Sequence, residues 1–283
     1  MRVPTDLEVI EWLKDSNTLT SLEEVSQTFL YHSKTPPKTE IAEETDVLQA
    51  FHTEIRPFVD HLLDVNEIRP PKIAYKTTNI DTGYLSLAAL QTASVCPRDT
   101  THTTRRQLIG FAALCSAIAL SAGFGIRTVL ESQRETTQIP IRKNQYKSED
   151  EEVQLKEDSL EEVQLASAHE YTHHIQNVYG IEYKTHSLFC EGQARGVERQ
   201  MASARGNKRM LEVFNAAYAD DHISRPHLEI ILQKGTVSAT KGMDKLFWEN
   251  RHMLGNILFT IAELKHGPGI YAEALRDPRV VLE

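Results

Sequence analysis

The stretch SLEEVQLASAHEYTHH, residues 159–174, decides the fold. Ser159 is followed three residues later by Glu162, which fits the capping box, in which the two side chains bond to the first free amides of a helix. The pattern therefore predicts a helix that begins after Ser159 and runs through His169 and His173. Because residues four apart on a helix lie on nearly the same face, this helix directs both imidazoles toward one point.

Residues 169–173 form the motif HExxH, which is typical of a zinc site. Two imidazoles and a carboxylate suit Zn²⁺ and leave one coordination position for water. Glu170 lies about 100° further round the helix than His169, so its carboxylate is not directed at the metal but can reach that water. In a chain with 12 histidines the motif arises by chance on the order of a few per cent of the time. The capped helix and a strand expected before it favour the metal site over chance.

A second motif, FCEGQARGVE at 189–198, places Glu191 eighteen residues after His173. Gln176 and Tyr179 exclude the long metzincin motif, which requires Gly and His at those positions. The sequence resembles the gluzincins, the thermolysin-like and aminopeptidase-like zinc peptidases, whose HExxH is followed after such a gap by E-G-x-A on a second helix. The resemblance implies that Glu191 is the third zinc ligand.

The resemblance also implies supporting roles near the metal. Glu198, seven residues after Glu191, would match the acid that orients a ligand or the substrate, while a surface salt bridge with Arg195 explains it equally well. We expect His174 to point away from the metal face and to act as a neighbouring support or a core residue.

The donor that would stabilise the oxyanion has two candidates. Aminopeptidase-like members carry a tyrosine three residues before a glycine in a C-terminal helix, and here Gly255 is preceded at that distance by His252. An imidazole N–H could do the same work. Tyr183, ten residues after His173, is the alternative.

The substrate implied is a peptide or protein. We expect the strand at 153–156, just before the active-site helix, to be the sheet edge on which an extended peptide lies. Residues 149–162 hold eight acidic groups out of fourteen, which could favour basic or amino-terminal substrate groups. Whether the enzyme is an endopeptidase or an aminopeptidase stays open.

Composition limits the possible partners and compartment. The net charge of −9 argues against a nucleic-acid partner. Three cysteines without a CxxC pair suit a reducing compartment, and the first residues lack the apolar run of a secretory signal. We therefore expect a cytoplasmic protein, whose oligomeric state the sequence leaves open.

An uncharged run of twenty residues, 107–126, is just long enough to span a bilayer. Its Ala, Ser and Gly content and its ending in AGFG favour a buried helix followed by a strand. A membrane span is the alternative.

These elements predict an α+β, zincin-like fold with a small mixed sheet over the active-site helix and the glutamate helix. We expect an N-terminal helical region (1–70), a catalytic subdomain (71–206) and a C-terminal helical subdomain (207–283). The elements expected are two short helices within 5–35, a helix at 41–65, strands near 72–76, 126–133, 137–142 and 153–156, and a helix at 246–264.

The function expected is that of a zinc-dependent peptidase, with Glu170 as the general base that activates water. One alternative keeps this site but anchors the protein in a membrane through residues 107–126. The other is a regulatory or binding protein that holds zinc without turnover, against which the intact Glu170 argues.

Overall fold

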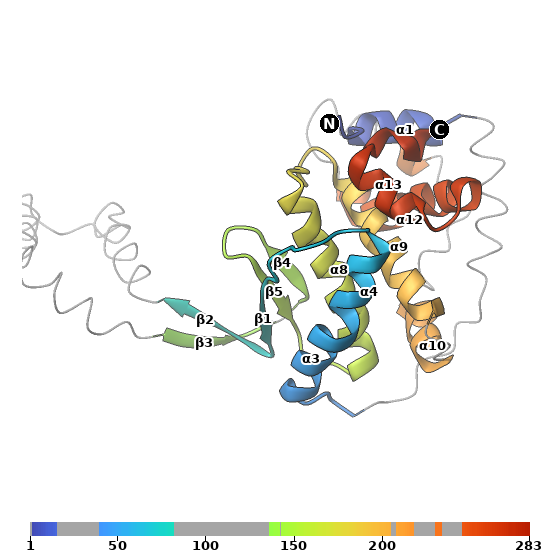
Figure 1. Ribbon diagram of the computed structural model, residues 1–283. Coiled ribbons are helices and arrows are strands. Elements are labelled where there is room, and N and C mark those ends of the chain that lie inside the picture. Colours follow the sequence, from blue (N-terminus) through green and yellow to red (C-terminus); the bar gives the residue numbers. More distant parts are fainter. Residues whose placement is uncertain are drawn as a thin grey trace, which may run out of the picture. The chain divides into compact units, whose positions relative to one another are not determined.

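A computed structural model describes residues 2–15, 40–81, 136–141, 143–204, 208–217, 230–233 and 245–283 (Figure 1). The described residues form a mixed α and β structure that is mostly helical and has a small three-stranded sheet. This agrees with the α+β class expected. The chain divides into two compact units, residues 1–76 with 141–283 and residues 77–140, and each is described by itself.

The sheet of the first unit has the order β1-β5-β4. Its strands are β1 (Lys72–Tyr75), β4 (Gln145–Lys147) and β5 (Glu152–Leu155). β5 pairs in parallel with β1, where Tyr75 faces Leu155, and antiparallel with β4, where Tyr146 faces Val153. Both edges of β5 are therefore occupied. The prediction that residues 153–156 form the edge of the sheet is wrong, and among the described strands β4 is the edge strand on that side of β5.

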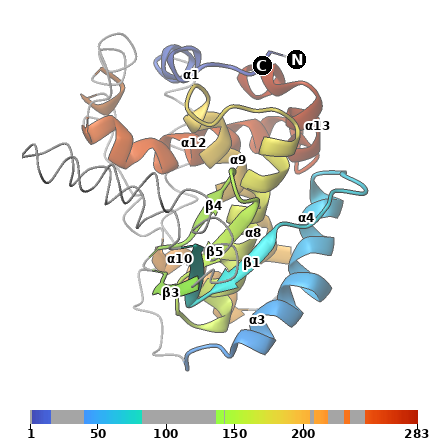
Figure 2. The ribbon, with the colours of Figure 1, turned by 90° about the vertical axis from the view of Figure 1, so that its left-hand side faces the viewer.

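The helix that carries the HExxH motif, α8 (Leu160–Val178), begins as the capping box predicts. The Ser159 hydroxyl accepts from the amide of Glu162, whose carboxylate accepts from the amide of Ser159. The glutamate helix α9 (Ser187–Ala204) lies between α8 and α12 (Lys245–His266) (Figure 1 and Figure 2). These three helices carry the residues discussed below.

Two glycines let α9 and α12 cross in backbone contact. A side chain on Gly192 would overlap the carbonyl of Gly255, and one on Gly255 would overlap the carbonyl of Leu188. The crossing brings the first half of α12, where His252 lies, over Glu191. The glycine in each sequence motif therefore has a packing reason.

The N-terminal helices pack around α8 and α9. α1 (Asp6–Leu13) begins with a capping box between Thr5 and Glu8, and the second short helix predicted within 5–35 lies outside the described residues. Asp6 accepts from the amide of Leu188 at 2.8 Å and from the hydroxyl of Ser187 at 2.7 Å, so it caps the first turn of α9. Burial raises the pKa of the Asp6 carboxyl.

The helix predicted at 41–65 is continuous but not uniform. It consists of α3 (Glu44–Ala50), a π-helical turn (Phe51–Ile55) and α4 (Arg56–Leu62). Its buried side chains pack against α8, where the ring of Phe51 meets Tyr171 edge to face at 5.4 Å. The helix from Glu44 to Leu62 therefore packs against α8.

Helices dominate the described residues after position 206, as predicted. They are α10 (Lys208–Ala217), α12, α13 (Ile270–Arg276) and a 3-10 turn (Pro278–Leu282). α12 covers the range 246–264 expected from apolar periodicity.

The second unit is described only as a two-stranded antiparallel ribbon. β2 (Thr77–Asp81) pairs with β3 (Thr136–Pro140), with Thr77 opposite Pro140. The strand predicted at 126–133 and the uncharged run at 107–126 lie outside the described residues. Among the helices that the structure describes, none combines the length and the apolar character that a bilayer crossing requires.

Candidate metal centre

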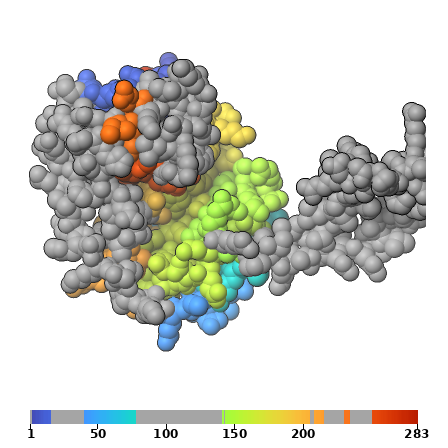
Figure 3. Space-filling view, turned by 180° about the vertical axis from the view of Figure 1, so that it is seen from behind, coloured from blue at the N-terminus to red at the C-terminus, as the bar shows by residue number. Residues whose placement is uncertain are grey.

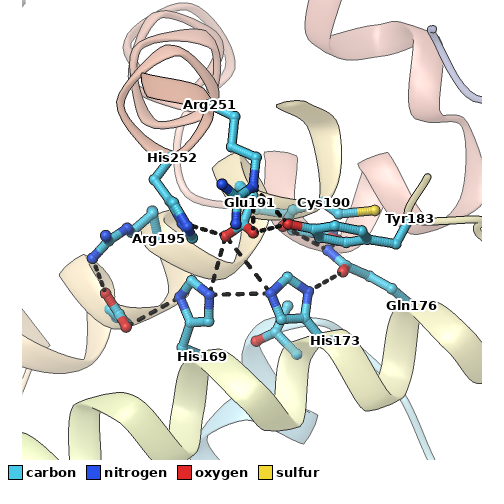
Figure 4. A network of polar contacts seen from close by, with 12 residues as sticks. His169, His173, Gln176, Tyr183, Cys190, Glu191, Arg195, Arg251 and His252 are labelled. Atoms are coloured by element: carbon cyan, nitrogen blue, oxygen red, sulfur yellow. Dashed lines mark hydrogen bonds and ion pairs between the residues drawn. The ribbon is translucent and has the colours of Figure 1, made fainter. Parts of the chain in front are cut away.

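Three donor atoms from two helices converge on one point (Figure 4). His169 and His173 point from α8 toward Glu191 on α9. Nε2 of His169 lies 3.1 Å from Nε2 of His173 and 3.2 Å from Oε2 of Glu191, and the third separation is 3.8 Å. Two ligand atoms bound tetrahedrally to one zinc ion lie about 3.3 Å apart. The spacing of the three atoms therefore fits a single ion.

The second nitrogen of each histidine faces an oxygen atom. Nδ1 of His173 lies 2.8 Å from Oε1 of Gln176. Nδ1 of His169 lies 3.1 Å from Oε1 of Glu198, at the distance of an ion pair but without the angle of a hydrogen bond. A proton on each Nδ1 leaves each Nε2 with a lone pair directed at the common point, as a metal ligand requires.

The electrostatics of the centre favour a cation. Burial lowers the pKa of His169, but the carboxylates of Glu198 and Glu191 outweigh it and raise that pKa to about 10. Burial raises the pKa of Glu191, but contacts with the nearby histidines hold it well below its usual value. Oε2 of Glu191 is buried and makes no hydrogen bond within the described residues. A metal ion would satisfy this atom.

The other oxygen of Glu191 is held by side chains outside the two motifs. The hydroxyl of Tyr183 donates to Oε1, and Nε of Arg251 lies 3.5 Å from Oε1 and donates to the hydroxyl of Tyr183 at 2.9 Å. Nδ1 of His252 lies 2.5 Å from Oε2. The two candidates for the oxyanion donor, Tyr183 and His252, thus both contact the same carboxylate.

Glu170 lies beside the donor triangle rather than in it. Its carboxyl group is buried, which raises its pKa, while the charges of His169 and His173 oppose that rise. Glu170 lines the cavities on both sides of the centre. This is the environment that a general base needs, since a raised pKa improves proton acceptance near neutral pH.

A cavity of about 630 Å³ opens at the centre and is lined by α8, α12 and the edge strand β4. In Figure 3 the green atoms of the β4–β5 segment border this hollow, and red atoms of α12 are seen across it. A smaller hollow of about 270 Å³ adjoins it, and both are lined by Asn144, His169, Glu170 and His252. The donor triangle therefore lies where the two hollows meet.

The two hollows differ in their charged residues. Besides the histidines and glutamates of the centre, the charged residues that line the larger one are Lys143, Glu182, Lys184 and Arg251. Of the acidic stretch 149–162, Asp158 and Glu162 line the smaller hollow. Any preference of the acidic stretch for positively charged ligands would therefore act in the smaller hollow.

Glu198 contacts both partners that the sequence suggests, a histidine of the centre and Arg195. Its carboxylate faces Nδ1 of His169 through Oε1 and lies 3.3 Å from Arg195 through Oε2. It therefore supports a candidate ligand and pairs with an arginine at once.

His174 points away from the donor triangle. Its Nε2 lies 2.8 Å from the carbonyl of Arg69 and its Nδ1 lies 3.1 Å from the hydroxyl of Tyr146 on β4. The side chain thus ties α8 to the edge strand.

Sequence reasoning missed two residues of the centre, Gln176 and Arg251. Gln176 stands three residues after His173, so helical spacing alone places it beside that ligand. Arg251 precedes His252, and no spacing rule distinguishes it from an exposed arginine. Its contact with Tyr183 depends on the crossing of α9 and α12.

The chain was compared with protein-family models, with curated proteins and with solved structures, and none of the three comparisons gave a match.

Proposed function

We propose that this protein is a zinc-dependent peptidase of the gluzincin type, with a zincin-like catalytic fold. One observation carries the proposal. His169, His173 and Glu191 present three ligand atoms at separations that suit one zinc ion, and the buried carboxyl of Glu170 lies beside them at an open cavity. This donor set, with an acid next to it, is what metal-assisted peptide hydrolysis requires.

Bound zinc would activate a water molecule and polarise the peptide carbonyl. Glu170 would accept the proton of that water and pass it to the leaving amine, a role suited to its raised pKa. Tyr183 and Arg251 would hold Oε1 of Glu191, which leaves Oε2 for the metal.

We assign the oxyanion to His252 rather than Tyr183. A phenol has one proton to donate, and Tyr183 gives it to Glu191. His252 contacts Glu191 through Nδ1, which makes no hydrogen bond within the described residues, so its Nε2 can carry the N–H that donates to the oxyanion. Burial lowers the pKa of this ring. Both residues line the cavity, so each can be tested there.

The edge strand β4 is the proposed support for an extended peptide. It borders the cavity, and the side of β4 that no described strand pairs with can add a strand through main-chain hydrogen bonds. The substrate is therefore a peptide or a flexible segment of a protein. Cys190 is a free buried thiol, in keeping with a reducing compartment such as the cytoplasm.

Metal analysis and a peptide library test the proposal together. The purified protein should contain one zinc ion per chain and cleave library peptides, and Glu191→Ala should lose the metal. Glu170→Gln should keep the zinc and lose hydrolysis. If Glu191→Ala retains full zinc, the ligand set is wrong. If the zinc-loaded protein cleaves nothing, a zinc-holding protein without turnover is the better explanation.

A further inference from the structure

Two buried glutamines connect the second histidine of the centre to backbone carbonyls of α9 and α13. Oε1 of Gln176 faces Nδ1 of His173 at 2.8 Å. Nε2 of Gln176 donates to the carbonyl of Cys190 at 3.0 Å and to Oε1 of Gln193 at 2.9 Å. Nε2 of Gln193 donates to the carbonyl of Tyr271 on α13 at 2.8 Å. Gln176 and Gln193 are 2% and 0% exposed.

The donor and acceptor of each hydrogen bond in this series of contacts are determined by the backbone carbonyls at its end. The carbonyls of Tyr271 and Cys190 can only accept, so the amide nitrogens of both glutamines must face them. Gln193 then presents its oxygen to Gln176, and Gln176 presents its oxygen to His173. Turning either amide over would set two acceptors against each other in a buried site, which costs about 1–3 kcal/mol per unsatisfied group.

We propose that Gln176 and Gln193 are positioning residues that hold the proton of His173 on Nδ1 and orient the ring, so that its Nε2 faces the metal position. An acceptor at Nδ1 selects this tautomer. A free neutral imidazole prefers the proton on Nε2, and in that form the nitrogen at the centre could not bind a metal. The inference rests on the proposed zinc site but not on peptide hydrolysis.

The two ligand histidines are thereby supported by different chemistry. His169 faces the carboxylate of Glu198, whereas His173 faces an amide that carries no charge. A second carboxylate behind His173 would add negative charge to a centre that already holds Glu191 and Glu198. The amide fixes the tautomer without that charge.

The first experiment measures the tautomer of His173 by ¹⁵N NMR of the histidine-labelled, metal-free full-length chain in a His169→Ala background, because Nε2 of His169 lies 3.1 Å from Nε2 of His173 and would otherwise influence the tautomer. His173→Gln in the same background assigns the His173 signals. With Gln176 present His173 should be protonated on Nδ1, and Gln176→Met should shift the proton toward Nε2. Gln164→Met is the matched control, because Gln164 is a buried glutamine on the same helix that bonds to Glu54. It should leave the His173 signals unchanged.

The second experiment measures zinc affinity by competition with a chromophoric chelator at fixed pH. Gln176→Met should weaken binding about 10- to 100-fold, as loss of a partner behind a ligand histidine does. Gln193→Met should weaken it less, because the carbonyl of Cys190 still orients Gln176. Gln200→Met is its control, because Gln200 also lies on α9 but donates to Glu263 and contacts neither histidine of the centre among the described bonds. Circular dichroism verifies folding of each variant.

The effects of the two glutamines on zinc affinity should be coupled if they position His173, and independent if they only fill space. Gln193→Met should have no further effect in the Gln176→Met background, since Gln193 acts through Gln176. Equal losses in both backgrounds, or an unchanged tautomer in Gln176→Met, would overturn it. Failure to bind zinc in the wild type would refute the proposed function, whereas the tautomer of the metal-free protein would still decide this inference.

Discussion

At the scale of single residues, Tyr183 and His252 both contact Glu191 but should fail in different ways when replaced. Tyr183→Phe removes a donor from the buried ligand carboxylate, so zinc affinity should fall about 10- to 100-fold. His252→Gln should keep zinc and lower kcat about 10²- to 10³-fold, as loss of an oxyanion donor does. Chelator competition and kcat at zinc saturation separate the two. A kcat loss confined to Tyr183→Phe would reverse the assignment.

The three residues that form the donor triangle could be grouped from the sequence because they depend on local spacing. His169 and His173 lie four apart on a capped helix, and the motif around Glu191 stood on a second helix. Arg251 could not be found this way, because its contact with Glu191 depends on a helix crossing set by packing. Local periodicity carries no information about such a crossing.

At the scale of elements, the cap of α9 comes from another helix. Asp6 precedes Ser187 by 181 residues in the chain and accepts from its hydroxyl and from the amide of Leu188. Asp6→Ala should therefore lower the free energy of unfolding by about 1 kcal/mol, measured by urea denaturation. Asp46→Ala, an exposed acid in the first turn of α3, is the control and should change it by less than about 0.5 kcal/mol. Equal values for the two variants would show that the cap contributes nothing.

Helix starts were predictable for the same local reason, and strand order was not. Each of the capping boxes at Thr5 and Ser159 depends on residues within a span of four positions. β4 has three residues, too few for an alternating pattern of apolar and polar side chains. Its pairing with β5, which makes β5 a central strand, could therefore not be predicted from the sequence. The π-helical turn inside the predicted helix at 41–65 was equally hidden.

At the scale of the whole molecule, we expect pH to change the stability of the metal-free protein and the affinity for the proposed zinc ion in opposite directions. The pKa of His169 is about 10 in the folded metal-free protein, above the ordinary 6.5. A raised pKa contributes stability that is complete below pH 6.5 and is lost as pH rises through 10. Zinc must displace this proton, so its affinity should increase over the same range.

The melting temperature of the chelator-treated protein should therefore fall between pH 7 and pH 9, while the increase produced by added zinc should grow. Thermal unfolding with and without zinc at both pH values measures the two trends. In His169→Gln, which keeps neither the proton nor the ligand, both trends should be reduced toward zero. A metal-free wild type that is more stable at pH 9 than at pH 7 would contradict the coupling, because no proton would then be held at the centre.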